Sequence, residues 1–238
     1  MRFTRLLCKI CLLAILVTSC SKNDSVAPGI QCYLTSLTDT IDIDLTLTYN
    51  SSNQVTGVQS SGGGLPSTFN YDSKGNITSI VNGLSTMVLT YNANGLLISI
   101  SNGSGSGSST TTLQYNGSGQ VTSETNEFSG FTETYTFAYP NTTTRNYVSR
   151  TLGTTTTTYE YDTKNTPTHA IKGIQLSLTD DTPSTDNNVT KRTTVSGSST
   201  NIYTYSYVYN EHGYPTTQTT TFPGSMTPQV VTFTYACK

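Results

Sequence analysis

One short phrase recurs along most of this 238-residue chain, and its recurrence limits the possible folds more than any other feature. Residues 71–80 read YDSKGNITSI, and related strings begin at Tyr49, Tyr91, Tyr115 and Tyr209. Copies of the phrase are marked by Tyr49, Tyr71, Tyr91, Tyr115, Tyr139, Tyr161, Tyr209 and Tyr235. Most of these tyrosines lie 20 to 26 residues apart, and a fixed period in this range indicates a repeat architecture.

The spacing between Tyr161 and Tyr209 is 48 residues, about twice the usual period. We interpret this gap as two repeat units, one of which is degenerate. The remnant of the degenerate copy is residues 186–193, because NVT at 188–190 resembles QVT at 54–56 in the first copy.

Each marker tyrosine ends a segment in which apolar or aromatic residues alternate with threonine or serine, as in Leu45, Leu47 and Tyr49. This period of two is typical of a half-buried strand with one aromatic face and one threonine face. Asn or Asp and then Gly or Asn follow the tyrosine, which predicts a hairpin turn of about four or five residues. The next strand has apolar residues at i and i+3, such as Ile77 and Ile80, which indicates a β-bulge or burial of both faces.

The pattern predicts an all-β fold: an antiparallel up-and-down meander of about 16 strands, without a helix of any length. A twisted meander of this size curls or closes, because exposed edges promote aggregation. We therefore expect an open or closed barrel rather than a two-sheet sandwich. A transmembrane barrel is disfavoured, because one strand face is Thr, Ser and Asn and the aromatic face is needed inside.

The first twenty residues are typical of an export signal. Arg2, Arg5 and Lys9 precede the apolar run ICLLAILV at 10–17, which is too short to span a membrane. The ending VTSC resembles the bacterial lipobox, in which the signal is cut before a cysteine that receives a diacylglycerol, here Cys20. Each buried acyl CH₂ contributes about 0.8 kcal/mol, so the lipid would hold the protein on a membrane without crossing it. The alternative is an ordinary secretory signal with an incidental cysteine.

These features divide the chain into a signal peptide (1–19), a lipidated tether (20–31) and one repeat domain (32–238). Removing the signal takes three of the 12 Lys and Arg and none of the 14 Asp and Glu, which leaves a net charge of −5. No basic stripe remains, so nucleic acid is not an expected partner. In an oxidising envelope, Cys32 and Cys237 predict a disulfide that places the first and last strands side by side, with two unpaired buried cysteines as the alternative.

The repeated phrase Y-[DN]-x-x-G-x-[IV]-T-x-[IV] resembles the YD repeats of the RHS class, which build shells of β-hairpins. With the lipobox and YDTKNTPTHAIKGI at 161–174, the chain looks more closely like a family of uncharacterised Bacteroidetes lipoproteins with a porin-like open-barrel domain of unknown function. The resemblance covers residues 32–238 and implies an outer-membrane lipoprotein on the periplasmic or cell-surface face. It implies a fold but no activity.

Few residues indicate chemistry, and neither a cofactor nor a catalytic residue is predicted. His169 and His212 lack the sequence neighbours of a metal or nucleophile motif, and we expect both in loops or on the surface. An acidic cluster carries oxygen groups that could bind Ca²⁺: Asp180, Asp181, Asp186, Asn187 and Asn188. Because it lacks the spacing of an EF-hand loop, we interpret it as a disordered acidic loop and predict no metal site.

Three functional hypotheses follow. The first is a non-catalytic, lipid-anchored envelope protein that binds an extracellular ligand such as a glycan. The chain has 16 tyrosines and no tryptophan, and these rings either fill the aromatic face or line a groove that stacks on sugars. The second hypothesis is a structural scaffold or adhesin subunit with protein partners. The third, the least favoured, is a glycoside hydrolase whose carboxylates come from distant strands. A hollow interior favours ligand binding, and a filled interior favours the scaffold.

Overall fold

The computed structural model describes residues 30–40, 44–62, 65–83, 85–104, 107–171 and 185–238. Within these residues the chain forms sixteen strands that pair in chain order until β16 pairs with β1. The strands are β1 (Cys32–Asp39), β2 (Asp44–Tyr49), β3 (Val55–Ser60), β4 (Ser67–Tyr71), β5 (Ile77–Asn82), β6 (Ser85–Tyr91), β7 (Leu97–Ser104), β8 (Gly107–Tyr115), β9 (Val121–Phe128), β10 (Phe131–Ala138), β11 (Ser149–Leu152), β12 (Thr155–Asn165), β13 (Asn187–Ser196), β14 (Ser199–Tyr209), β15 (Pro215–Thr221) and β16 (Gln229–Cys237). The signal peptide and Cys20 lie outside the described residues.

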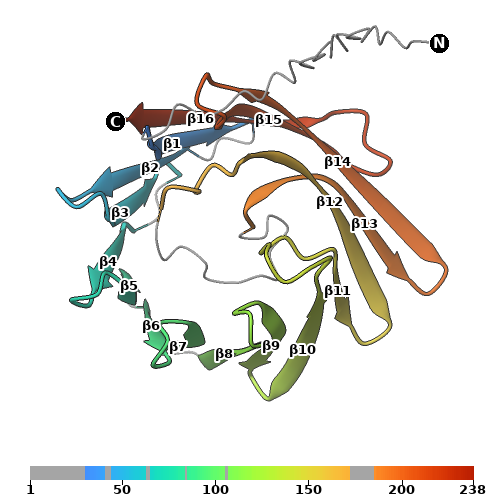
Figure 1. Cartoon of the computed structure of the whole chain (residues 1–238), viewed down its shortest axis with the longest axis horizontal. Coiled ribbons are helices and arrows are strands. Elements are labelled where there is room, and N and C mark those ends of the chain that lie inside the picture. The colour runs from blue at the N-terminus through green and yellow to red at the C-terminus, as the bar shows by residue number, and fades with distance from the viewer. Residues whose placement is uncertain (1–29, 41–43, 63–64, 84, 105–106, 172–184) are drawn as a thin grey trace, which may run out of the picture.

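The sheet is a closed barrel, and Figure 1 shows its strands arranged around a ring. The predicted antiparallel meander is confirmed, and of the open and closed forms the closed one is found. The sandwich alternative is wrong, because β1 pairs with both β2 and β16 in one continuous sheet. Closure removes the unpaired edges that would otherwise promote association between sheets.

Five of the turns share one geometry, which the turn after Tyr91 illustrates. The backbone N–H of Asn92 donates to the carbonyl of Leu96 at 2.9 Å. The side-chain Oδ1 of Asn92 accepts the N–H groups of Asn94 and Leu96, each at 3.0 Å. Gly95 has a φ of 78°, which glycine adopts without strain. The same bonds recur in turns that begin at Asn50, Asp72, Asn116 and Asn210.

A β-bulge follows each of these turns and explains the apolar residues at i and i+3. Tyr71 pairs with Ile77 in the strand after the turn. The preceding Asn70 pairs with Ser79, so one residue on the second strand is left over. The extra residue shifts the alternation by one, and Ile77 and Ile80 both become buried, at 0% and 8% exposure. The bulge is therefore confirmed as the explanation.

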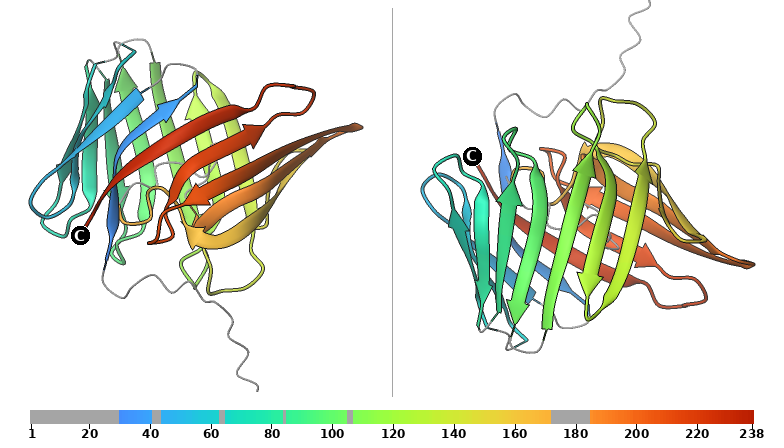
Figure 2. Two further views of the ribbon diagram at one scale, coloured as in Figure 1. Left: turned by 90° about the horizontal axis from the view of Figure 1, so that it is seen from above. Right: turned by 90° about the horizontal axis from the view of Figure 1, so that it is seen from below.

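The barrel has two distinct rims. An even number of antiparallel strands brings Cys32 and Cys237 to the same rim, which also holds the five Asx turns; we call it the turn rim. The opposite rim, the hairpin rim, holds tight loops such as those between β9 and β10 and between β13 and β14. In Figure 2 the β13–β14 hairpin reaches beyond its neighbours at this rim.

The two faces of the wall differ as the alternation predicts. In β6, Met87, Leu89 and Tyr91 belong to the apolar core inside the barrel, whereas Val88 and Thr90 are exposed. Threonine or serine often occupies the outward positions, as in β2, where Thr46 and Thr48 are exposed. Among the residues that the structure describes, no helix is long and apolar enough to cross a membrane.

The interpretation of the 48-residue gap as two repeat units is wrong. Tyr161 in β12 pairs directly with Val189 in β13, the register that other marker tyrosines make with the residue six positions later. The Oδ1 of Asp162 accepts the N–H groups of Lys164 and Asn188, as the Asx residue does in every intact turn. The gap is therefore one repeat unit whose turn carries a long insertion, and the resemblance at 188–190 marks where the unit resumes.

Candidate functional site

The marker tyrosines end their strands at the turn rim, where tyrosine hydroxyls form a regular series of hydrogen bonds that we call the tyrosine belt. The hydroxyl of Tyr71 donates to the carbonyl of Val55 at 2.7 Å, and that of Tyr115 donates to Leu97 at 2.6 Å. In both of these bonds the acceptor is the first residue of the strand that follows the previous turn. The other pairs are Tyr49 with Leu34, Tyr91 with Ile77, Tyr139 with Val121, Tyr161 with Tyr147, Tyr207 with Val189 and Tyr235 with Pro215.

The belt requires neutral phenols, and its surroundings favour that form. Burial and, to a smaller extent, the neighbouring phenols of Tyr139 and Tyr91 together raise the pKa of Tyr115 to about 12. Burial also raises the pKa of Tyr139 to about 12. Belt tyrosines are therefore hydrogen-bond donors at any physiological pH, which is a structural role and not that of a catalytic acid or base.

Tyr209 is a marker tyrosine that leaves the belt. Its hydroxyl donates to Oδ2 of Asp162, and Tyr207, two residues earlier, takes the belt position by donating to Val189 at 2.8 Å. Burial and the carboxylate of Asp162 raise the pKa of Tyr209. A carboxylate accepts a stronger hydrogen bond than a carbonyl does, which explains why Tyr209 bonds to Asp162 and leaves the carbonyl of Val189 to Tyr207. The repeated phrase marks Tyr209 and not Tyr207. The sequence could not predict the change, because Tyr209 bonds to Asp162 only in the repeat whose turn is interrupted.

Residues 140–148, between β10 and β11, fold into the ring near the turn rim (Figure 1). Tyr147 is fully buried there and packs edge-on against Phe137 and Tyr159, with ring centroids 5.0 and 5.1 Å apart. The side chain of Gln120 donates to two backbone carbonyls of this segment, at 2.8 and 2.6 Å. This part of the interior is therefore filled by side chains.

Asp186, one of the possible calcium ligands, is bonded to protein groups instead. Its Oδ1 accepts a hydrogen bond from Nε of Arg145 at 2.7 Å, and its Oδ2 accepts one from the backbone N–H of the same residue at 2.8 Å. Burial alone would raise the pKa of Asp186, but the hydrogen bonds and charge of Arg145 lower it overall. Asn187 and Asn188 donate to backbone carbonyls at 3.0 and 2.9 Å. The interpretation of this cluster as a disordered loop is therefore wrong for Asp186 to Asn188, because Asn187 and Asn188 begin β13 and Asp186 is bonded to Arg145. Residues 180 and 181 lie outside the described residues.

The start of the insertion crosses the turn rim towards the first strands (Figure 1). Asn165 donates its backbone N–H to Gly213 at 3.1 Å, and Ile171 is buried in a cluster with Leu34, Val55 and Phe233. His169 lies in this crossing segment, exposed, with its ring 6.3 Å from that of Tyr214. The position of His169 in an exposed loop agrees with the sequence expectation.

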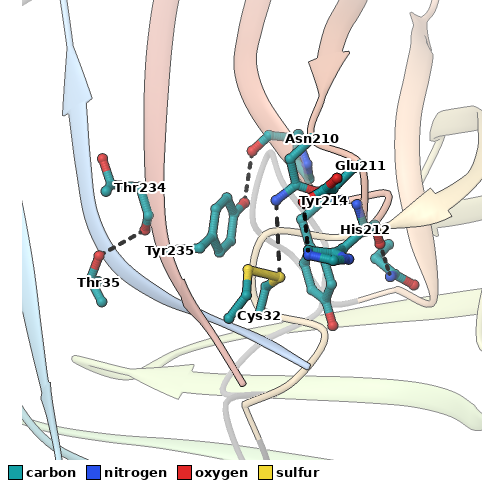
Figure 3. Close-up of a disulfide and its surroundings, with 11 residues drawn as sticks. Cys32, Thr35, Asn210, Glu211, His212, Tyr214, Thr234 and Tyr235 are labelled. Carbon is teal, nitrogen blue, oxygen red and sulfur yellow. Dashed lines mark hydrogen bonds and ion pairs between the residues drawn. A yellow bond between two sulfur atoms is a disulfide. The ribbon is translucent and has the colours of Figure 1, made fainter. Parts of the chain in front are cut away.

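Cys32 and Cys237 are joined by a disulfide at the turn-rim end of the β1–β16 pair (Figure 3). The backbones of Gln31 and Lys238 exchange two hydrogen bonds of 3.0 Å just beyond it. His212 projects from the turn between β14 and β15 towards the same place, and its Nε2 lies 3.5 Å from a carboxylate oxygen of Glu211. The disulfide and the last backbone pairs together close the ring.

The sulfur atoms of Cys32 and Cys237 and a ring nitrogen of His212 all lie within 4.8 Å of one another. Sulfur and imidazole nitrogen are the usual ligands of zinc, but only a thiolate binds the metal. Both sulfurs are bonded to each other here. The cluster is therefore a histidine beside the disulfide that the sequence predicts. Sequence reasoning did not bring His212 to this place, because the three residues come from distant parts of the chain.

A cavity of about 300 Å³ lies in the inner wall near the hairpin rim. It lies over β10 to β14, away from the filled turn rim, and its lining is polar, basic and aromatic. The lining residues are Tyr135, Arg150, Leu152, Thr155, Thr157, Arg192, Thr194, Asn201 and Tyr203. Among the described residues, the interior is thus filled by side chains around Tyr147 near the turn rim and has a cavity of this size near the hairpin rim.

Two arginines stack on tyrosine rings in this cavity. The guanidinium carbon of Arg192 lies 3.9 Å from the ring centroid of Tyr203, and that of Arg150 lies 5.4 Å from the ring centroid of Tyr135. Arg192 is only 5% exposed. Stacking of this kind holds the planar guanidinium group by its face and fixes its orientation.

A signal for these residues was present in the sequence. Arg192 lies three positions after Val189, and this is the inward position that Ile80 holds after Ile77. The position is apolar in the repeats that begin at Val55, Ile77 and Leu97 but is Glu124 in the repeat that begins at Val121, so the charged residues Glu124 and Arg192 both mark a change in the interior. Sequence reasoning missed Arg192 because the interrupted turn concealed the register of β13.

Comparisons with known proteins identify the repeat and the barrel. The family model described as RHS Repeat matches residues 91–132, which form the hairpins from the end of β6 to the start of β10. This match agrees with the predicted YD-type repeat. Comparison with curated proteins finds no match.

A porin-like protein of Bacteroides uniformis has a similar structure, with a TM-score of 0.61 and 16% identity over 85% of this chain and 98% of that one. A porin-like protein of Bacteroides vulgatus matches with a TM-score of 0.45 and 11% identity over 86% and 99% of the two chains. The Tc holotoxin pore of Photorhabdus luminescens matches with a TM-score of 0.31 and 18% identity over 82% of this chain and 9% of that one. The similarity to the Bacteroides uniformis protein supports the barrel fold and nothing beyond the fold.

Proposed function

We propose that this protein is a non-catalytic, lipid-anchored protein of the cell envelope that binds an extracellular ligand, most simply a glycan, inside its barrel. The observation that carries the proposal is the polar and aromatic cavity of about 300 Å³ near the hairpin rim. Small-ligand sites are typically concave and about 300–1,000 Å³ in volume, with a few polar groups that converge on the ligand.

The proposed anchor agrees with the arrangement of the barrel. The tether leads to β1 at the turn rim, so the cavity would open on the side away from the point of attachment. The outward strand face is rich in Thr and Ser, whereas a barrel that spans a membrane presents an apolar band to lipid. Labelled palmitate should enter the wild-type protein but not the Cys20→Ala variant. Labelling that survives this substitution would contradict the anchor.

Binding inside the cavity can be tested by filling it. Thr194 lines the cavity, whereas the adjacent Thr193 points out of the same strand. Ligands found on a glycan array should bind the Thr193→Trp control as they bind the wild type, measured by calorimetry. The Thr194→Trp variant should lose binding because the indole occupies the cavity. Equal binding by both variants would place the ligand elsewhere.

A scaffold or adhesin subunit is the second candidate, because one exposed apolar pair lies at the hairpin rim. Phe128 and Phe131 are 41% and 67% exposed, and their rings stack with centroids 6.0 Å apart. Such a pair suits contact with a protein partner. Cross-linking that captures one specific protein, with loss on Phe131→Ser and no glycan binding, would favour this candidate.

Hydrolysis is not proposed. A glycoside hydrolase needs two carboxyl groups beside the bound sugar. The described residues that line the cavity supply two arginines and no carboxylate. Measuring the release of reducing ends from any glycan that binds is the direct test.

A further inference from the structure

We propose that Cys32, Cys237 and His212 form a zinc site when the disulfide between the two cysteines is reduced. The three residues lie at the turn rim and do not line the cavity, so this site is independent of the proposed glycan binding. In the oxidised protein a covalent bond joins the first and last strands. In the reduced protein a metal ion joins them at the same place.

The three ligand atoms are close enough for one zinc ion. The sulfur atoms of Cys32 and Cys237 and a ring nitrogen of His212 all lie within 4.8 Å of one another. Zinc binds sulfur at about 2.3 Å and imidazole nitrogen at about 2.0 Å, so its tetrahedral ligands lie about 3.5–4 Å apart. Two thiolates and one imidazole are a ligand set that zinc prefers. Once the sulfurs separate, rotation of the side chains brings all three ligands around one ion.

The strand pair keeps the two cysteines opposite each other whether or not their sulfurs are bonded. Cys32 pairs with Cys237 in the register of β1 and β16, and the ladder continues along both strands. On the other side, the backbones of Gln31 and Lys238 exchange two hydrogen bonds of 3.0 Å. The Cβ atoms of directly opposed residues lie about 4.5–5.5 Å apart, a spacing from which two thiolates reach a single ion.

The turn between β14 and β15 positions the third ligand. The Oδ1 of Asn210 accepts hydrogen bonds from the backbone N–H groups of His212 and Tyr214, each at 3.0 Å. The side-chain amide of Asn210 also donates to Sγ of Cys32 at 4.0 Å (Figure 3). One side chain therefore connects the histidine to the cysteine. Its amide is placed to donate to a thiolate, and outer contacts of this kind orient the ligands of a metal.

Among the five intact Asx turns, only the one beside the disulfide carries a histidine. His212 stands two positions after Asn210, and a carboxylate oxygen of Glu211 lies 3.5 Å from its Nε2. In the other four turns the same position holds a residue that is not a usual zinc ligand: Ser52, Lys74, Asn94 and Ser118. The repeat thus departs from its pattern where the ring closes, and there it adds an imidazole and a negative charge, both of which favour a cation.

The disulfide is open to a reductant on one side, because Cys32 is buried and Cys237 is exposed. A dithiol supplies the reduction by thiol–disulfide exchange. One of its thiolates attacks Sγ of Cys237, the protein S–S bond breaks, and the second thiol of the reductant closes a new disulfide within the reductant. The protein gains two electrons and two protons. Zinc then displaces both thiol protons, and water takes the fourth position of the tetrahedron.

The experiment measures zinc binding by the full chain in its oxidised and reduced forms. The reduced form is prepared with excess dithiothreitol, which is then removed without exposure to oxygen. Calorimetry should show one zinc ion bound by the reduced protein and binding at least about 100-fold weaker by the oxidised protein, since loss of even an outer-shell partner costs about 10-fold to 100-fold. Cobalt in place of zinc should give the charge-transfer absorption of a cobalt–thiolate bond only after reduction. Zinc should also raise the urea midpoint of the reduced form alone.

Variants then test each ligand. Cys32→Ser/Cys237→Ser keeps the other three of the five cysteines and should lose the binding that follows reduction. His212→Gln should weaken zinc binding by the reduced protein at least about 10-fold. This variant keeps the turn, because the turn is held by the backbone N–H of His212 and not by its ring. The matched control is His169→Gln, which removes the other histidine of the chain and should bind zinc as the wild type does.

Zinc that binds only after reduction, is lost with the two cysteines and is weakened in His212→Gln but not in His169→Gln supports the site. Equal binding by the oxidised and reduced forms, no binding by either form, or no effect of His212→Gln overturns it. Where circular dichroism shows that reduction unfolds the barrel, zinc should restore the native spectrum of the wild type, and His212→Gln should need at least about 10-fold more zinc. A reduced wild-type chain that stays unfolded in excess zinc also overturns the site. None of these results bears on glycan binding.

Discussion

Replacing a belt tyrosine with phenylalanine removes one hydroxyl and keeps the ring, so it isolates the hydrogen bond of the belt. In Tyr115→Phe the lost bond is the 2.6 Å contact with the carbonyl of Leu97, a residue that is 8% exposed. A hydrogen bond contributes about 0.5–1.5 kcal/mol net, and a buried acceptor without a partner costs about 1–3 kcal/mol. We expect the free energy of unfolding to fall by about 1–2 kcal/mol.

Urea denaturation followed by circular dichroism measures this loss. For a domain of this size, about 1–2 kcal/mol corresponds to a fall in Tm of about 2–8 °C. The matched control is Tyr203→Phe, which removes a hydroxyl that is not part of the belt and keeps the ring next to Arg192. This control should change the free energy of unfolding by less than about 0.5 kcal/mol. The double variant Tyr71→Phe/Tyr115→Phe should show additive losses, because the two bonds share no partner.

The outcome that contradicts this reasoning is a Tyr115→Phe variant that is as stable as the wild type. The regular hydroxyl contacts would then be a by-product of repetition, and ring packing alone would explain why the phrase carries a tyrosine. An equal loss in both variants would show that any hydroxyl in the barrel matters, wherever it lies.

Three further predictions follow. Reducing the disulfide, or changing Cys32 to Ser, should cost about 5 kcal/mol, since the bridge closes a loop with a sequence separation of 205; an unchanged urea midpoint with and without dithiothreitol would contradict this. Asn92→Ala should destabilise the barrel by about 1–2 kcal/mol by freeing two backbone N–H groups, whereas the exposed Asn94→Ala should be nearly neutral in the same assay. Tyr115 and Tyr139 have pKa values of about 12, above the ordinary 10.0 of the unfolded chain. Between about pH 10 and 12 the native state therefore binds more protons than the unfolded state does. Stability should therefore be complete below about pH 10 and fall as the pH rises towards 12, and a flat urea midpoint over that range would refute the burial of these phenols.

The strands and turns could be predicted because their signals are local. Alternation before each marker tyrosine defines a strand and its inward face, and the bonds of Asn92 involve only residues two and four positions away. The spacing of Ile77 and Ile80 already indicated the bulge, although burial of both strand faces was an alternative explanation of the same spacing. The insertion after Asp162 was misread as a degenerate copy, because a sequence period cannot distinguish a lost hairpin from a lengthened turn.

The sequence by itself determined the repeat, the strands, the turn chemistry and the antiparallel order, since each depends on neighbours in the chain. Only the tertiary structure decided that the ring closes, that each belt hydroxyl meets a carbonyl of the previous repeat, and that Tyr207 replaces Tyr209 there. It also decided that Arg150 and Arg192, 42 positions apart, line one cavity. The physical reason is that these contacts join strands from different hairpins, whose distance is set by the curvature of the closed sheet and not by any local pattern.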